Sequence, residues 1–392
     1  MRGWNEMTMT KAERVMNQFL RKPVDYLPSQ ITFSDRSRDN EIKTLLNLDP
    51  DMSLDDYLEN HIHFTFVTDD WPLFFRNIDP VIEDGQEKGF MWKDAAARTV
   101  FDRFGMGVLI GEDGFFTNYG VLEGNKEMNK IAAKHLPDHL TRLMDMPIEK
   151  AVEAYEVPDP FTPGNFEWFE RDKDGVAGDL CVIPSGYFGI YERGYAILGF
   201  QQFMTEIAGN PKIVYTLMEK LTDYRIKLAK VKADLGYRIA HHGDDLAMQN
   251  CGFFSPKMFD EILLPHFKRL FAEYKKYDMY VFLHSCGQMA DYLPQLIDAG
   301  LDGWEPVQPC NDLRKMKREY GKDLIFMGGI DEQRLPFMKT DEVREMTKET
   351  IQILGKGGGY IIAPSQELMA DVPLENIAAV VETAIEWRER AM

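Results

Sequence analysis

Residues 323–363, DLIFMGGIDEQRLPFMKTDEVREMTKETIQILGKGGGYIIA, contain one full repeat of the pattern that decides the fold. A short apolar run, Asp323–Met327, precedes an amphipathic stretch, Asp341–Leu354, and a second apolar run follows at Tyr360–Ala363. Gly355 stands directly after the amphipathic stretch, where glycine commonly ends a helix. A strand, a helix and a second strand in this order are typical of a parallel sheet with helical crossovers.

The same alternation extends through much of the chain. Two further amphipathic stretches, Pro211–Leu235 and Pro256–Tyr277, begin with proline, which suits the first turn of a helix. Eight apolar runs are candidate strands: Leu27–Phe33, His63–Thr68, Leu180–Pro184, Arg238–His242, Met279–His284, Leu301–Val307, Asp323–Met327 and Tyr360–Ala363. Eight is the number that a closed (β/α)8 barrel needs, so we predict an α/β protein of the TIM-barrel type. An open doubly wound sheet is the alternative. Such a fold is expected to contain a Gly-x-Gly-x-x-Gly turn after an early strand, and the sequence has none.

One segment, from about 70 to 179, breaks this rhythm. It is too long for one crossover helix and contains glycine-rich, aromatic pieces such as Gly105–Asn118 and Asp159–Gly178. Long connections of this kind usually serve as lids or binding loops. We therefore expect a single domain over residues 1–392, with an N-terminal extension, an insertion over the barrel mouth and a last helix within Glu375–Met392.

The composition favours a globular protein that acts on small molecules or binds other proteins. The 392 residues include 45 Lys and Arg against 64 Asp and Glu, a formal charge of −19, and 44% are hydrophobic. This charge would repel a phosphate backbone, and no basic stripe offsets it, so nucleic-acid binding is not expected. No segment reaches the roughly 18 apolar residues of a membrane span, and the N-terminal stretch lacks the apolar core of a signal peptide. Four cysteines without a Cys-x-x-Cys pair suggest reduced thiols in the cytoplasm.

The carboxyl ends of the predicted strands hold the candidate site residues, because the active sites of such barrels lie there. His284 and Cys286 are two residues apart at a strand end, so both side chains can face one ion, and they suit zinc. A packed histidine beside a buried thiol is the alternative, although the strand-end position and the following Gly287 favour the metal site. Asp244 and Asp245 could orient a ligand or bind a metal, but they could instead cap the following helix. Asp331 has the same two interpretations.

Two of the other three cysteines and the aromatic residues have mainly structural interpretations. Cys181 and Cys251 lie in apolar stretches and are predicted to be core residues. Most of the large side chains near the strand ends would pack in the core or lid, yet as a group they predict an apolar pocket wide enough for a flat molecule. These residues are Phe188, Tyr191, Phe253, Phe254, Trp304 and Met327.

Taken together, the motifs resemble the uroporphyrinogen decarboxylase superfamily, and within it the cobalamin-dependent methyltransferases. The matching segments cover most of the chain: Met9–Arg14, Pro23–Pro28, Gly243–Gln249, Phe254–Pro256, Leu283–Gly287, Pro306–Pro309, Met327–Asp331 and Gly357–Ile361. The resemblance implies a (β/α)8 barrel with its site at the mouth.

Two departures separate the chain from the decarboxylase. The decarboxylase's Arg-Gln-Ala-Gly-Arg loop, which binds substrate carboxylates, corresponds here to Phe33–Arg38, without the Gln-Ala-Gly core. Its histidine near the last strand is replaced by Pro364–Glu367. A substrate with many carboxylates would also be attracted poorly to a chain of charge −19. Decarboxylation is therefore the second reading, and a non-catalytic protein that binds a tetrapyrrole or corrinoid is the third.

The methyltransferase branch implies a zinc ion bound by the His-x-Cys pair and by a cysteine after the last strand. That third position holds Gln366 or Glu367 here, so we predict Glu367 as the third ligand ahead of Cys310. A zinc ion with one thiolate and one oxygen ligand is more Lewis acidic than a zinc ion with two thiolates. It is therefore better suited to polarise the oxygen of a leaving group than to activate a thiol acceptor.

The expected activity is methyl transfer from a small methylated substrate, an aromatic methyl ether, to Co(I) of a corrinoid. Asp245 and Gln249 would position the substrate, with Phe188, Tyr191, Phe254, Trp304 and Met327 around it. The chain has no Asp-x-His-x-x-Gly signature for cobalamin, so the corrinoid is expected on a separate partner protein. The sequence does not decide the oligomeric state, a homodimer being one alternative.

Overall fold

The structure is a computed structural model that describes residues 9–33, 39–49, 51–70, 85–87, 90–110, 116–173 and 178–390. Residues 34–38, where the sequence departs from the decarboxylase loop, lie outside the described residues. The same is true of parts of the predicted insertion, at 71–84, 88–89, 111–115 and 174–177, and of the last two residues of the predicted C-terminal helix.

A five-stranded parallel sheet forms the larger half of the core. Its strands stand in the order β12-β11-β10-β9-β8, so neighbours in space are also neighbours along the chain. The register pairs Gly243 with His284 and His284 with Glu305, which sets the ends of three strands side by side. The strands are β8 (Ile239–Gly243), β9 (Tyr280–His284), β10 (Gly303–Val307), β11 (Ile325–Ile330) and β12 (Tyr360–Pro364).

Two more strands, β1 (Ile62–Thr65) and β7 (Cys181–Pro184), pair in parallel as a second sheet. The first predicted run, Leu27–Phe33, forms only isolated parallel bridges, in which Ser29 meets both Asn60 and Ile362. The Asn60 side chain binds the N–H and the carbonyl of Ile31 (2.7 and 2.9 Å), in place of a continuous strand ladder. All eight predicted runs therefore take part in parallel pairing.

The α/β class with parallel sheets is confirmed, whereas closure into a barrel is not shown. Between β7 and β8 the described residues form no strand ladder. Two backbone hydrogen bonds join Gly243, the last residue of β8, to the chain just after β7. Its N–H donates to the carbonyl of Gly186 (2.8 Å), and its carbonyl accepts from the N–H of Gly189 (2.7 Å).

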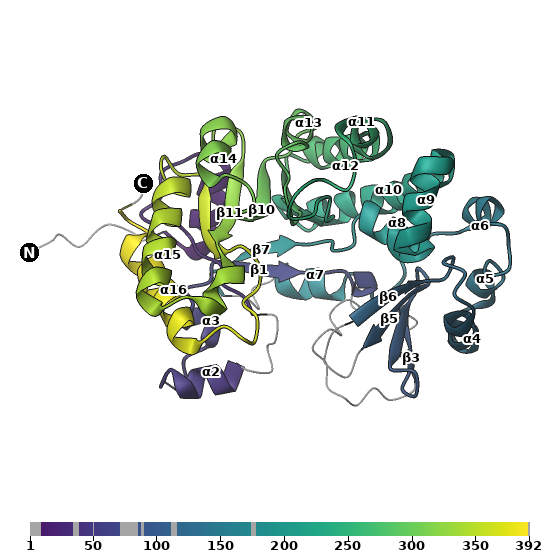
Figure 1. The fold of residues 1–392 in the computed structure, drawn as a ribbon, viewed down its shortest axis with the longest axis horizontal. Coiled ribbons are helices and arrows are strands. Elements are labelled where there is room, and N and C mark those ends of the chain that lie inside the picture. Colours follow the sequence, from purple (N-terminus) through teal and green to yellow (C-terminus); the bar gives the residue numbers. More distant parts are fainter. Residues whose placement is uncertain are drawn as a thin grey trace, which may run out of the picture.

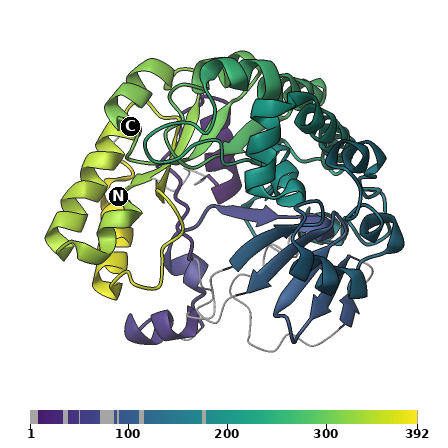
Figure 2. The same ribbon diagram turned by 45° about the vertical axis from the view of Figure 1, so that its right-hand side comes forward.

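The predicted insertion contains a sheet of its own. Five antiparallel strands follow one another in chain order: β2 (Gly85–Glu87), β3 (Met91–Asp94), β4 (Thr99–Asp102), β5 (Met106–Ile110) and β6 (Phe116–Gly120). Figures 1 and 2 show this sheet beside α8 (Tyr191–Leu198) and α9 (Phe200–Gly209), on the opposite side of the molecule from the C-terminal helices. The contact is close, because Leu122 donates to the carbonyl of Ile197 (3.0 Å) and a Cβ on Gly120 would lie 2.2 Å from that oxygen.

The predicted helices at Pro211–Leu235 and Asp341–Leu354 are confirmed as α10 (Pro211–Asp234) and α15 (Thr340–Leu354). The stretch Pro256–Tyr277 is divided by a π-helical turn, Phe259–Leu263, which lies just before Pro265, a residue with no N–H to donate.

In the described part of the chain, no helix combines the length and the apolar character needed to cross a membrane. The remaining helices are α1 (Lys11–Phe19), α2 (Asp39–Leu45), α3 (Leu54–Tyr57), α4 (Lys126–His135), α5 (Asp138–Thr141), α6 (Ile148–Ala154), α7 (Glu167–Arg171), α11 (Pro256–Met258), α12 (Leu264–Lys276), α13 (Leu293–Asp298), α14 (Leu313–Tyr320), a 3₁₀ helix (Glu332–Phe337) and α16 (Leu374–Trp387).

A buried network of ion pairs ties the inserted sheet to the rest of the fold. Asp70 is fully buried and accepts hydrogen bonds from Arg193 of α8 (3.2 Å) and Arg225 of α10 (3.3 Å). Arg193 also pairs with Asp102, at the end of β4 in the inserted sheet. The two arginines therefore link the inserted sheet, α8 and α10 through two carboxylates that have no access to water.

Candidate metal centre and substrate cavity

His284 and Cys286, the predicted pair, lie together at the end of β9. The imidazole Nε2 is 3.8 Å from Cys286 Sγ. It is also 3.6 Å from Asp245 Oδ1, in the loop after β8. One donor atom from each of these three residues lies within 4.8 Å of the other two. An imidazole, a thiol and a carboxylate at this spacing form a donor set that suits zinc.

The structure brings Asp245, rather than Glu367 or Cys310, to the His-x-Cys pair. Gln366 Nε2 donates to Cys286 Sγ (3.3 Å), so the residue that follows β12 and touches the thiol is Gln366. Glu367, the next residue, is not among the grouped donors, and Leu368 after it donates to the carbonyl of Thr32 (2.8 Å). Cys310 Sγ accepts a hydrogen bond from its neighbour Asn311 and is not among the grouped donors. Asp245, predicted to position substrate, also binds the N–H of Cys286 (2.7 Å).

Glu305 orients the His284 ring and was not singled out from the sequence. Its Oε1 is 2.8 Å from His284 Nδ1 and 2.8 Å from His241 Nε2. The hydrogen bond at Nδ1 leaves the other ring nitrogen, Nε2, facing Cys286 and Asp245. Histidines that bind metals commonly have such a carboxylate at the second nitrogen. Glu305 lies opposite His284 on the neighbouring strands β10 and β9. This pairing could be known only from the strand register, so the sequence alone did not indicate Glu305.

His241, His284 and Glu305 are a second group of donors within 4.8 Å of one another. His241 and Glu305 are both buried, and His241 Nδ1 is already 2.6 Å from Ser185 Oγ. We therefore interpret this second group as the support of the His284 ring, and the group with Asp245 as the candidate metal centre.

The protonation of these groups follows from their burial and their neighbours. Burial, with the Asp245 carboxylate, raises the pKa of the Cys286 thiol to about 11. Burial alone would lower the pKa of His284, but Glu305 and Cys286 hold it well above its ordinary value. Burial alone would raise the pKa of Glu305, yet His284 and His241 hold it at about 2. Without a metal, the centre therefore contains a thiol and an imidazolium against an ionised Glu305.

We expect the affinity for zinc to rise by about one to two powers of ten per pH unit between about pH 6 and 8. Zinc binds thiolate and neutral imidazole, so it must displace the Cys286 proton and the His284 proton, whose pKa values are both raised. Competition titrations with a zinc chelator at several pH values measure this slope. An affinity that stays constant over the range would contradict the assignment.

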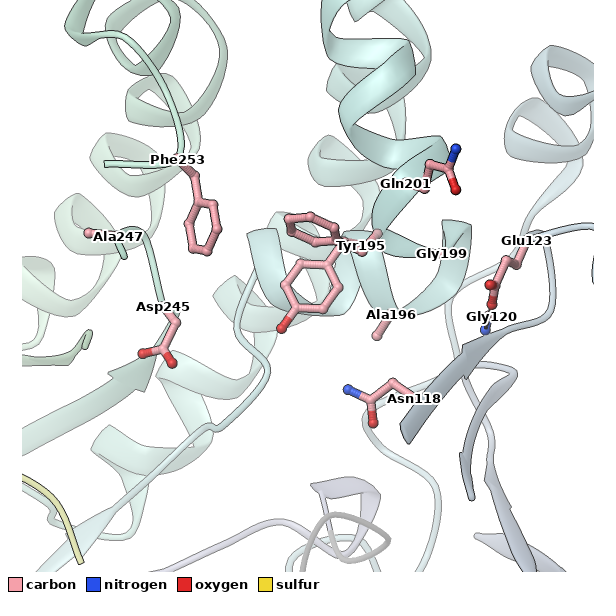
Figure 3. Close-up of a pocket in the computed structure, with 11 residues that line it drawn as sticks. Asn118, Gly120, Glu123, Tyr195, Ala196, Gly199, Gln201, Asp245, Ala247 and Phe253 are labelled. Atoms are coloured by element: carbon pink, nitrogen blue, oxygen red, sulfur yellow. Dashed lines mark hydrogen bonds between the residues drawn. The ribbon is translucent and has the colours of Figure 1, made fainter. Parts of the chain in front are cut away.

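A cavity of about 490 Å³ opens next to the candidate metal centre. Asp245 lines the cavity and also belongs to the donor group, so the cavity and the candidate metal centre share this residue. Figure 3 shows Asp245 and Phe253 on one side and Asn118 and Glu123 of the insertion on the other, with Tyr195 between them. The other lining residues are Gly120, Ala196, Gly199, Phe200, Gln201 and Ala247. Asn118, Gly120 and Glu123 of the insertion therefore form one wall of the cavity.

Comparison with known families matches residues 192–387, half of the chain, to the family described as Uroporphyrinogen decarboxylase (URO-D). The chain belongs to the URO-D family. Similar proteins include the methylcobamide:CoM methyltransferase MtaA of Methanosarcina barkeri, 21% identical over 57% of this chain and 64% of that protein. They also include uroporphyrinogen decarboxylase 2 of Arabidopsis thaliana, 24% identical over 59% of each chain. The matches confirm the predicted resemblance, and the chain spans less than two thirds of the length of these relatives.

Among solved structures, a methyltransferase from Methanosarcina mazei shares the fold of this URO-D protein. The TM-score is 0.61 at 16% sequence identity, over 97% of this chain and 99% of the other. Similarity at this identity is evidence for the fold alone. The relatives of this URO-D protein thus include methyltransferases and decarboxylases, which supports an enzyme.

The predicted substrate contacts of this URO-D protein lie in its packed interior. Phe188, Tyr191, Phe254, Trp304 and Met327 are all buried, and none of them lines the cavity. Trp304, for example, is fully buried and donates its indole N–H to the carbonyl of Ser285 (2.9 Å). Position at a strand end does not show whether a side chain faces the cavity or the core. Tyr191 and Phe254 instead support the wall from behind, as Tyr191 packs against the Phe253 ring (6.1 Å between centroids).

Four other predictions have definite outcomes. Cys181 is buried, as predicted, but Cys251 is exposed, because it lies in a turn where Met248 donates to its carbonyl (2.8 Å). Asp244 caps a helix, although it is α8 and not the following helix, through the N–H groups of Ile190 and Glu192. Gln249 is exposed and donates to Gln308 (2.8 Å), away from the lining of the cavity.

Proposed function

We propose that this URO-D protein is a corrinoid-dependent methyltransferase, which moves a methyl group from a small aromatic methyl ether to Co(I) on a partner protein. The observation that carries the proposal is Asp245, which belongs both to the donor group with His284 and Cys286 and to the wall of the cavity. A substrate in the cavity would thus lie next to a bound metal ion.

Zinc fits the residues at this centre. His284, Cys286 and Asp245 would hold it, and the buried Glu305 carboxylate would fix the imidazole, as expected for a ligand of zinc. The ion would supply Lewis acidity at the leaving oxygen, and the corrinoid would supply the nucleophile that the side chains lack. A single thiolate favours an oxygen leaving group over a thiol acceptor.

The chain's own residues would bind and orient the ether. Phe200 and Phe253, whose ring centroids are 5.8 Å apart, offer aromatic surface for a flat ring. The Tyr195 hydroxyl also lines the cavity and donates to Glu192 (3.2 Å). We take the eight parallel segments to close as a (β/α)8 barrel, with this cavity at its mouth.

The alternative of a uroporphyrinogen decarboxylase fits the cavity less well. Among the lining residues that the structure describes there is no lysine or arginine, while Glu123 and Asp245 are acidic. The carboxylates of a porphyrinogen would find no basic partner among these residues, so burying them in the cavity would cost a large desolvation free energy. A non-catalytic tetrapyrrole- or corrinoid-binding protein remains the third alternative.

Two parallel incubations separate the three alternatives. In one, the zinc-loaded protein receives an aromatic methyl ether and a reduced corrinoid protein. In the other it receives uroporphyrinogen. We expect release of the phenol in the first and no loss of carboxyl groups in the second. The opposite pattern would identify a decarboxylase, and no product in either would support the non-catalytic binding protein.

The third metal ligand can be identified by substitution. We expect Asp245→Asn to weaken zinc binding by about tenfold or more, because an amide oxygen is a poorer ligand than a carboxylate. Glu367→Gln and Cys310→Ser, the ligands expected from the sequence, should change the affinity much less. Chelator competition on the three variants measures the order. A larger loss for either Glu367→Gln or Cys310→Ser would return the third ligand to that residue.

The partner and the location of the protein remain predictions. A separate corrinoid protein is required by the proposed reaction, and the charge of −19 would favour a partner with a basic face. Four free cysteines fit a reducing compartment such as the cytoplasm.

A further inference from the structure

The cavity is acidic and has no basic side chain among its described lining residues. Its charged groups are Asp245 and Glu123. A third acid, Glu192, is buried behind Tyr195 and accepts the hydrogen bond of the Tyr195 hydroxyl. Burial, with the Asp245 and Asp244 carboxylates, raises the pKa of Glu192 well above its ordinary value, which favours its neutral form.

Glu123 is held in place by the backbone around it. Its Oε2 accepts a hydrogen bond from the N–H of Gly120 (3.2 Å), at the end of the inserted sheet. Its Cγ lies against Gly199, where a Cβ would come within 2.4 Å of it. Gly199 has a φ of +78°, so glycine suits this position on two grounds. The carboxylate of Glu123 is therefore a fixed feature of the wall, across the cavity from Asp245 (Figure 3).

Aromatic rings line the space between the two carboxylates. The Tyr195 and Phe200 ring centroids are 5.6 Å apart, and those of Phe200 and Phe253 are 5.8 Å apart. The faces of such rings attract cations, and they do so more strongly where water is excluded. Rings flanked by carboxylates, without a basic group, favour a positively charged occupant over an anion.

We propose that the cavity selects methoxylated aromatic substrates that carry a protonated amine and excludes their carboxylate analogues. The ammonium group would lie at Glu123 and the nearby rings, and the ether oxygen at the opposite end, next to Asp245. The orientation of the ether rests on the proposed methyl transfer. The preference for positive charge rests on Glu123 and the rings, because a zinc ion would offset the charge of Asp245.

Three probes with the same ring test this preference: 3-methoxybenzylamine, 3-methoxybenzyl alcohol and 3-methoxybenzoate. At low salt we expect the full-length protein without zinc to bind the amine about tenfold or more tighter than the benzoate, with the alcohol between them, because no metal ion can then bind the benzoate carboxylate. Calorimetric titration measures all three affinities without any need for turnover. Equal affinities, or tightest binding of the benzoate, would overturn the proposal.

A matched pair of variants locates the effect. Glu123→Gln removes the charge of the wall while keeping its shape, and should weaken amine binding about threefold while improving benzoate binding. Glu127→Gln makes the same charge change on α4, outside the cavity lining, and should leave the three affinities unchanged. If both variants changed the affinities equally, the assignment to Glu123 would be wrong.

Methyl transfer separates this inference from the proposed function. Tight amine binding without transfer from any probe would reject the methyltransferase and keep the charge preference. Transfer that is fastest from the benzoate would keep the methyltransferase and reject the charge preference.

Discussion

Replacing Cys286 with alanine is expected to abolish stoichiometric zinc binding and to lower methyl transfer by more than about a hundredfold. Cys286 provides the only sulfur in the donor group of the described residues, and its backbone N–H anchors Asp245 (2.7 Å). Because the side chain is only partly buried at the end of a strand, the fold should tolerate the loss of the thiol. On one preparation of the variant, metal analysis tests the loss of zinc, a rate measurement tests the loss of methyl transfer, and a thermal melt tests whether the fold is retained.

Cys310→Ala is the matched control for this prediction. Cys310 is also a partly buried free thiol after a strand of the same sheet, but it does not belong to the donor group. The Cys310→Ala variant should therefore retain both zinc and activity. Full metal content and full activity in Cys286→Ala would reject the candidate metal centre.

Replacing Arg193 with methionine is expected to destabilise the protein by about 3–5 kcal/mol. Arg193 is 1% exposed, and its removal takes the paired arginine from Asp102 and leaves Asp70 with the Arg225 ion pair alone. Burial already raises the pKa of Asp102 to about 6, with Arg193 opposing the shift. Without Arg193, a buried carboxylate must take up a proton or remain without a charged partner, and the inserted sheet loses its ion pair with α8.

Arg269→Met is the comparison for this effect. Arg269 also contacts two carboxylates, Glu219 (2.5 Å) and Asp223 (2.6 Å), but it is 39% exposed, so its loss should cost no more than about 1 kcal/mol. Urea unfolding curves of both variants and the wild type give the two values. Losses of similar size would mean that the buried network contributes little beyond an ordinary surface pair.

The parallel core could be predicted from the sequence, because each strand there is a continuous apolar run followed by a helix signal. The runs at Met279–His284 and Tyr360–Ala363 match β9 and β12 to within a residue or two. The inserted sheet could not be predicted in this way. Among the residues that the structure describes, its strands, from β2 (Gly85–Glu87) to β6 (Phe116–Gly120), follow one another with no helix between them, so the strand–helix alternation that marked the parallel core is absent.

The candidate site was only partly predictable for a similar reason. His284 and Cys286 are close in the chain, so their proximity followed from spacing alone. Glu305 and Asp245 come from neighbouring strands, and their contact with His284 depends on a register that hydrophobic pattern does not give. Trp304, next to Glu305, was predicted to touch substrate but points into the core, since alternate residues of a strand face opposite sides.

The most direct test of the central claim is the consumption of Co(I) in a single turnover. Zinc-loaded protein, reduced corrinoid protein and an aromatic methyl ether are mixed without oxygen, and the absorbance of Co(I) is followed. We expect Co(I) to be consumed with one phenol released for each methyl-corrinoid formed, and the zinc-free protein to show neither change. Phenol release at the same rate without any corrinoid, or equal rates with and without zinc, would contradict the account.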